Sequence, residues 1–106
     1  MELIRMSKIP LESTIVKKIL TWLNKQPGVK AEKTHGGMYG KSGKPDITGC
    51  INGRRFELEV KRPGGKPTQL QLKELREWKE AGAITAVVYS LDDVKETLKE
   101  TGYKTS

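Results

Sequence analysis

Apolar residues recur along this chain with two spacings, one typical of helices and one typical of strands. Near the N-terminus they follow helical spacing until Gln26-Pro27-Gly28 interrupts the run. The positions concerned are Leu11, Ile15, Val16, Ile19, Leu20 and Leu23. We therefore predict an amphipathic first helix here, followed by a short strand over residues 29–34.

A β-hairpin is predicted in the middle of the chain. Two strand-like runs, Asp46–Ile51 and Arg54–Lys61, flank the dipeptide Asn52-Gly53. Asn-Gly supplies the two positive φ angles of a type I′ turn, so it is a strong local signal for a two-residue hairpin loop.

The second half of the chain alternates between helix and strand patterns. Thr68-Gln69-Leu70-Gln71 has the form of a capping box, and it opens a helix whose apolar stripe is Leu72, Leu75 and Trp78. We expect Trp78 in the core rather than as a platform for nucleobases. Residues 84–89 form an apolar run of strand length, and Ser90 begins a last helix.

The predicted order of elements is αβββαβα, in a chain of 106 residues. This length leaves room for one domain, which we place at residues 1–106. A strand, a helix and a further strand from residue 54 to 89 are long enough for a parallel crossover. The fold class expected is α/β, with a mixed sheet of about four strands flanked by helices.

The hairpin turn fixes which side chains face each other. If Ile51 pairs with Arg54, then Asp46 lies opposite Glu59. Because side chains alternate along a strand, one face of the hairpin is polar and the other is apolar. The polar face holds Asp46, Thr48, Cys50, Arg55, Glu57, Glu59 and Lys61. The apolar face holds Ile47, Ile51, Phe56, Leu58 and Val60.

Two carboxylates directly opposite each other repel, unless something compensates their charge. A divalent cation is a natural compensation, and we identify Asp46, Glu59 and the backbone carbonyl of Val60 as its candidate ligands. Oxygen ligands completed by water and phosphate suit Mg²⁺ or Mn²⁺. Lys61, on the same face, could stabilise negative charge in a transition state or orient an attacking water.

A solvated hairpin face is the alternative interpretation. Lys61 and Arg55 would then only neutralise the acids. We assign a supporting role to Glu57, either behind the metal ligands or as a partner of Arg55, since it lies opposite Thr48 rather than Asp46.

The charge of the chain favours a polyanionic partner. Its net charge is +7, and the segment from residue 30 to 66 carries nine Lys and Arg residues against four acids. Nucleic acid is the partner that this balance suggests first. Lys41, Lys44, Arg62 and Lys66 are the candidates for contacts with its phosphate backbone. A merely solubilising basic surface is the alternative.

Several classes of site and location are disfavoured by what the sequence contains. One cysteine, Cys50, forms neither an internal disulfide nor a multi-cysteine zinc site, and the single histidine, His35, excludes paired-histidine zinc motifs. We find no secretory signal and no apolar run that would span a membrane. The expected location is cytoplasmic, with no membrane contact and no small-molecule cofactor.

The residues Gly43-Lys44-Pro45-Asp46, followed after twelve residues by Glu59-Val60-Lys61, resemble the PD-(D/E)xK nuclease signature. More narrowly, the chain resembles the VRR-NUC family, whose fold is a restriction-endonuclease-like core. In that family a helix bearing a glutamate precedes the Pro-Asp motif, as Glu12 does here. A Ser/Thr-x-x-Gln helix start follows the lysine, as Thr68 to Gln71 do.

The resemblance implies metal-dependent hydrolysis of phosphodiester bonds in DNA, leaving 3′-hydroxyl and 5′-phosphate ends. Asp46 and Glu59 would bind Mg²⁺ or Mn²⁺, with Lys61 near the attacking water. Glu12 would assist the metal shell or the lysine, and Gln71 would line the site.

Stand-alone VRR-NUC proteins of phages and bacteria are similar to junction resolvases, which act as homodimers on branched DNA. The expected function is therefore a structure-selective endodeoxyribonuclease. Two alternatives stay open at this point: a catalytically silent, basic nucleic-acid-binding domain, and a basic protein-interaction module without nucleic-acid affinity.

Overall fold

The computed structural model describes residues 9–35 and 43–105, and its elements follow the predicted order. One sheet has the strand order β1-β2-β3-β4, with β1, β2 and β3 antiparallel and β4 parallel to β3. The predicted mixed four-stranded sheet is confirmed. The elements are α2 (Glu12–Leu23), β1 (Val29–Lys33), β2 (Ile47–Ile51), β3 (Arg54–Val60), α3 (Gln69–Glu80), β4 (Ile84–Val88) and α4 (Leu91–Glu100).

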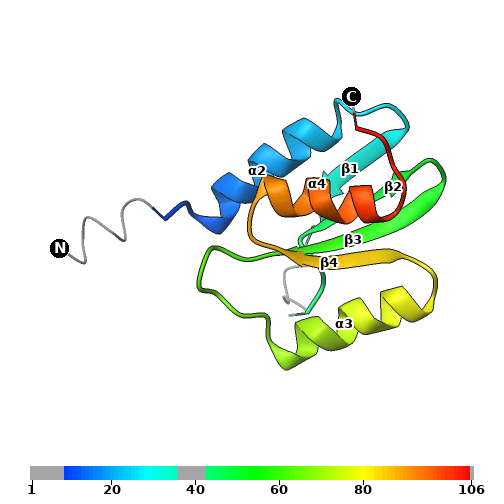
Figure 1. Ribbon diagram of the computed structural model, residues 1–106. Helices are drawn as coiled ribbons and strands as arrows, with labels where there is room; N and C mark the ends of the chain where they lie inside the picture. The colour runs from blue at the N-terminus through cyan, green and yellow to red at the C-terminus, as the bar shows by residue number, and fades with distance from the viewer. Residues whose placement is uncertain (1–8, 36–42, 106) are drawn as a thin grey trace.

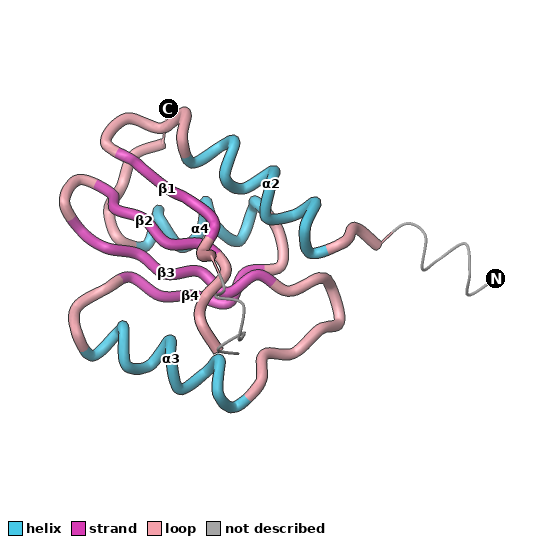
Figure 2. Tube along the Cα trace, turned by 180° about the vertical axis from the view of Figure 1, so that it is seen from behind, coloured by secondary structure: helices cyan, strands magenta, loops and turns pink. Residues whose placement is uncertain are grey.

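The helices lie on both faces of the sheet. Helices α2 and α4 lie together on one face, and α3 lies on the other, as the two opposite views show (Figures 1 and 2). Helix α3 packs against β3 and β4. Within residues 9–35 and 43–105, no helix combines the length and the apolar character needed to cross a membrane.

The hairpin between β2 and β3 has the predicted turn and register. Asn52 and Gly53 have φ angles of 49° and 84°, the positive values that a type I′ turn requires. Ile51 pairs with Arg54, and Ile47 pairs with Leu58. Successive side chains along β3 therefore point alternately to the face covered by α2 and α4 and to the face covered by α3.

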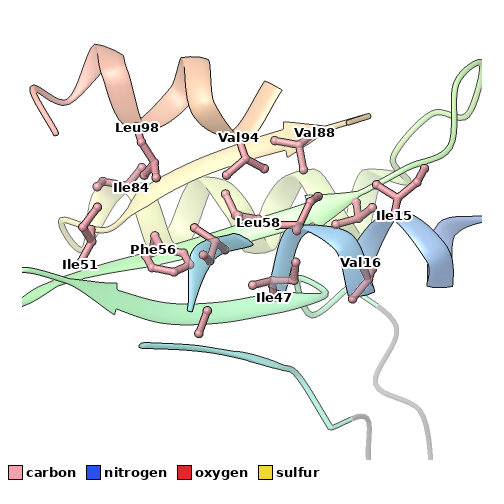
Figure 3. Packing of buried hydrophobic residues seen from close by; sticks show 14 residues of the cluster. Ile15, Val16, Ile47, Ile51, Phe56, Leu58, Ile84, Val88, Val94 and Leu98 are labelled. Atoms are coloured by element: carbon pink, nitrogen blue, oxygen red, sulfur yellow. The ribbon is translucent and has the colours of Figure 1, made fainter. Parts of the chain in front are cut away.

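The hydrophobic core lies between the sheet and the pair α2 and α4 (Figure 3). Its buried members come from α2, the four strands, α4 and no part of α3, among the residues that the structure describes. The apolar face predicted for the hairpin is thus the core face. The members are Ile15, Val16, Ile19, Leu23, Ala31, Ile47, Ile51, Phe56, Leu58, Val60, Ile84, Val88, Val94 and Leu98.

The side chain of Asn24, just after α2, holds the outer edge of β1. Its Nδ2 donates to the carbonyl of Ala31 at 3.0 Å, and its Oδ1 accepts from the Ala31 amide at 2.9 Å. This side chain thus satisfies the backbone groups of Ala31 that point away from β2, and it ties the end of α2 to the sheet.

Three expectations about apolar side chains are wrong. Trp78 is only half-buried and lies outside the core, and Leu72 is 39% exposed, so that Leu75 is the buried residue of α3. The reason is that α3 faces the polar side of the sheet, which offers little apolar surface to cover. Leu11 is 60% exposed because it is the extended residue before α2 rather than part of its first turn.

Gly49, on the core face of β2, provides a test of this packing. A Cβ atom there would lie 2.3 Å from the carbonyl oxygen of Lys30 and 2.6 Å from Cζ of Phe56. We expect Gly49→Ala to lower the free energy of unfolding by about 1 to 3 kcal/mol, as overpacking does. Urea unfolding measures this change. Cys50→Ala, at the next and exposed position, is the control, and equal midpoints for the two variants would contradict the packing described.

Candidate functional site

Asp46, Glu59 and Lys61 meet on the polar side of the hairpin, at the end away from the turn. Asp46 directly precedes β2, and the pairing of Ile47 with Leu58 puts Glu59 opposite it, as predicted. The Asp46 carboxylate accepts a hydrogen bond at Oδ2 from the Val60 amide at 2.8 Å. This contact holds the Asp46 side chain against β3.

The residues before Asp46 explain how its position is fixed. Gly43 has a φ of +113°, and a Cβ atom there would lie 2.7 Å from Cγ of Leu70, so only glycine fits this approach to the start of α3. Pro45 is fully buried, and the carbonyl of Asp46 accepts from the Thr34 amide at 2.8 Å. The Gly-Lys-Pro sequence therefore anchors the loop that carries the carboxylate.

Glu59 is buried without full compensation of its carboxyl group. It is 1% exposed, and its Oε1 atom has no hydrogen-bond partner. Burial, followed by hydrogen bonding to Asp46 and the charge of that residue, raises the pKa of Glu59 to about 8. Lys61, whose Nζ lies 3.7 Å from Oε2 of Glu59, lowers this pKa, and the charge of Glu12 raises it.

These groups fit a hard divalent cation. A buried carboxyl oxygen without a partner beside a second carboxylate is an arrangement that a bound cation would stabilise, and the oxygen donors are of the kind that Mg²⁺ and Mn²⁺ prefer. Asp46, Glu59 and the carbonyl of Val60 would be its protein ligands. Over the described ranges no group of three His, Cys, Asp or Glu side chains gathers to hold a metal ion. Water and substrate oxygens would have to complete the shell, as is usual for Mg²⁺.

Glu12 and Gln71 lie where the sequence predicts them. Glu12 acts on Glu59 through its charge, whereas Gln71 caps α3. Glu12 is the first residue of α2, and its charge acts on Glu59. Gln71 makes the predicted capping box: its Oε1 accepts from the Thr68 amide at 2.8 Å, and its own amide donates to Thr68 Oγ1 at 3.1 Å. Its amide side chain is thus engaged in capping α3.

The predicted backbone-binding cations are not equivalent. Lys44 and Lys66 are exposed, whereas Arg62 is half-buried and donates to the carbonyl of Ile9 at 3.2 Å. Lys41 lies outside the described residues. The contact of Arg62 joins residues that are far apart in sequence, so no local pattern could have indicated it.

Glu57, two residues before Glu59, is buried but paired with a cation. Its Oε2 accepts from Nε of Arg55 at 2.8 Å and from the hydroxyl of Thr48. The predicted pairing with Arg55 is confirmed. Sequence reasoning missed that Arg55 also stacks on Trp78, with its guanidinium carbon 4.1 Å from the ring centroid. The signals that could have indicated this contact were a tryptophan on α3 and an arginine on the polar face of β3.

The raised pKa of Glu59 predicts how stability depends on pH in the absence of divalent ions. Between its ordinary value of 4.5 and about 8, the folded state holds a proton that the unfolded chain has released. Stability should therefore fall as the pH rises through this window. Thermal unfolding in EDTA at several pH values should show a steeper loss for the native protein than for Glu59→Gln. Parallel curves for the two proteins would contradict the assignment.

No family model matches this sequence, and a search of curated proteins found no match. Among solved structures, a protein described as "VRR_NUC domain" is similar, with 29% sequence identity and a TM-score of 0.69. The similarity covers 87% of this chain and 97% of the other. The resemblance to the VRR-NUC family that the motifs indicate is therefore confirmed, and this chain has the fold of a VRR-NUC domain.

Proposed function

We propose that this protein is a Mg²⁺- or Mn²⁺-dependent DNA endonuclease. The observation that carries the proposal is the pair Asp46 and Glu59, on one face of the sheet, with Lys61 beside them and one Glu59 oxygen buried without a partner. VRR-NUC is a nuclease family, and the solved domain resembles this chain over most of its length. Its similarity supports nuclease activity, and the acid pair supports a need for metal.

Each side chain has a separate task in this proposal. Asp46 and Glu59 would hold the cation, which when bound would supply Lewis acidity at a phosphate oxygen. The ammonium of Lys61, 3.7 Å from Glu59, would stabilise negative charge that develops on the phosphate during in-line attack by water. Glu59 must release its proton to bind the ion, so metal affinity should rise with pH toward about 8.

The proposed substrate is DNA, and branched DNA in particular. The exposed Lys44 and Lys66 flank the acid pair in sequence and would contact the phosphate backbone. We further propose a single nuclease domain that acts as a homodimer in the cytoplasm, since twofold symmetry would present two sites to two strands.

A catalytically silent nucleic-acid-binding domain is the second candidate. It is favoured by the finding that, in the part of the chain that the structure describes, no three potential metal-binding side chains come together. The two candidates differ in their response to divalent ions. Labelled junction, flap, linear duplex and single-stranded DNA, incubated with Mg²⁺, Mn²⁺ or EDTA, separate them, since the silent domain would bind without cutting.

Alanine substitution in the acid pair tests the mechanism. Asp46→Ala should lower cleavage below detection, because it removes a cation ligand. Lys61→Ala should slow cleavage by about 10²- to 10³-fold, the usual effect of removing one group that stabilises transition-state charge. Both variants should still bind DNA, which gel shifts in EDTA would measure.

Matched controls exist for both variants. Asp92→Ala and Lys73→Ala change exposed residues of the same types on α4 and α3. These variants should cut DNA at the native rate. Undiminished cleavage by Asp46→Ala or Lys61→Ala would remove the proposed mechanism.

The proposed backbone contacts can be tested through salt dependence. Lys44→Gln and Lys66→Gln should each reduce the slope of log affinity against log salt by about 0.9, because each removes one phosphate contact on duplex DNA. Lys99→Gln, at an exposed position of α4 on the opposite face, should leave the slope unchanged. If all three variants had the same slope, the DNA would have to bind at a surface other than that of Lys44 and Lys66.

A further inference from the structure

A small cavity lined mainly by polar and charged residues lies near the acid pair, between the sheet and α3. Its volume is about 120 Å³. Thr48, Arg55 and Glu57 line it on the sheet side, and Glu74 and Trp78 line it on the helix side. None of these residues has a part in the proposed hydrolysis.

Arg55 is held in one orientation at the wall of this cavity. Its guanidinium lies over the ring of Trp78, its Nε donates to Glu57 at 2.8 Å, and a terminal nitrogen donates to Thr48 Oγ1 at 3.1 Å. The side chain is still 49% exposed. The structure thus presents a flat cation, fixed before any ligand binds, with half of its surface open.

The charges around the cavity balance. Lys44 and Arg55 contribute two cations, and Glu57 and Glu74 contribute two carboxylates. Thr34 also lines it, and the hydroxyl oxygen of this residue is buried without a hydrogen-bond partner. This balance disfavours a phosphate group, which two carboxylates would repel, and favours a flat, neutral and polar ligand.

The cavity lies next to the proposed catalytic centre. Arg55, Glu57 and Glu59 occupy every second position of β3 and therefore share one face. Glu57 is thus about 7 Å along the strand from Glu59. Lys44 and Thr48 lie two residues before and after Asp46. A nucleotide chain with one phosphate at the acid pair would therefore carry a neighbouring nucleotide to the cavity.

We infer that this cavity binds an unpaired nucleobase of the strand that is cut, a role that rests on the proposed nuclease function. Nucleobases are flat and polar, and they stack on arginine planes and aromatic rings in many nucleic-acid-binding proteins. A helical peptide is excluded as the occupant, because an α-helix, 10–12 Å wide, is too large for this space. A base inside a duplex cannot enter, so the site selects DNA with unpaired or extruded nucleotides near the scissile bond.

The test uses the full chain and branched DNA in EDTA, so that no cleavage occurs. Each DNA carries a single 2-aminopurine, whose fluorescence is quenched by stacking, at one unpaired position near the branch. Saturating protein should quench the probe at one or two positions. Absence of quenching at every position would overturn the inference.

Variants of Arg55 decide whether the cavity causes the quenching. Arg55→Gln should abolish it and weaken binding about tenfold, within the range of one stacked base. Arg55→Lys keeps the charge but loses the planar guanidinium, so it should also abolish the quenching. Because it keeps the charge, this variant should bind DNA more tightly than Arg55→Gln. Arg76→Gln, at an exposed position of α3 outside the cavity, is the matched control and should behave as the native protein.

The outcomes separate this inference from the proposed function. Native quenching in Arg55→Lys would show that Arg55 acts only as a charge and would overturn the base site, whether or not the protein cuts DNA. Quenching that depends on Arg55, without cleavage in any divalent ion, would support the base site and contradict the nuclease. Circular dichroism of each variant confirms that a lost signal reflects lost contact rather than unfolding.

Discussion

The structure depends on the register of the β2–β3 hairpin. The turn at Asn52 and Gly53 determines which residues oppose each other, and a shift of one residue would exchange the two faces of a strand. In the observed register, Phe56 and Leu58 alternate with Glu57 and Glu59. Burial of the apolar face against α2 and α4 therefore also fixes the acids on the side of α3. The stability of the core and the geometry of the candidate site have one common cause.

Two buried glutamates on β3 differ in how the charges of their carboxyl groups are compensated. Glu57, 2% exposed, accepts hydrogen bonds from Arg55 and Thr48 at one of its oxygens, and the charge of Arg55 compensates its own. Glu59, two residues on, is equally buried, but it faces another acid and keeps an oxygen without a partner. Folding alone gives no reason for this cost. The contrast between the two residues supports the proposal that Glu59 belongs to a cation-binding site, whereas Glu57 forms a structural ion pair.

Local signals predicted most of the fold, because each had its cause within a few residues. The Asn-Gly turn and the Thr68 to Gln71 capping box are confirmed, and the opposition of Asp46 and Glu59 followed from the turn alone. The position of Trp78 did not follow. Helical spacing shows that Leu75 and Trp78 share a side of α3, but it does not show that this side meets the polar face of a sheet. The bond from Arg62 to Ile9 likewise joins segments that no short pattern relates.

The contact between Asn24 and Ala31 has a consequence for self-association. Strand β1 is at the edge of the sheet, and unpaired backbone groups at an edge invite a strand of another molecule to add to it. The amide side chain of Asn24 occupies the donor and the acceptor of the central residue of β1, as a further strand would. A side chain from the same molecule thereby occupies the place at Ala31 that a strand of another molecule would need, which disfavours pairing of two copies through this edge.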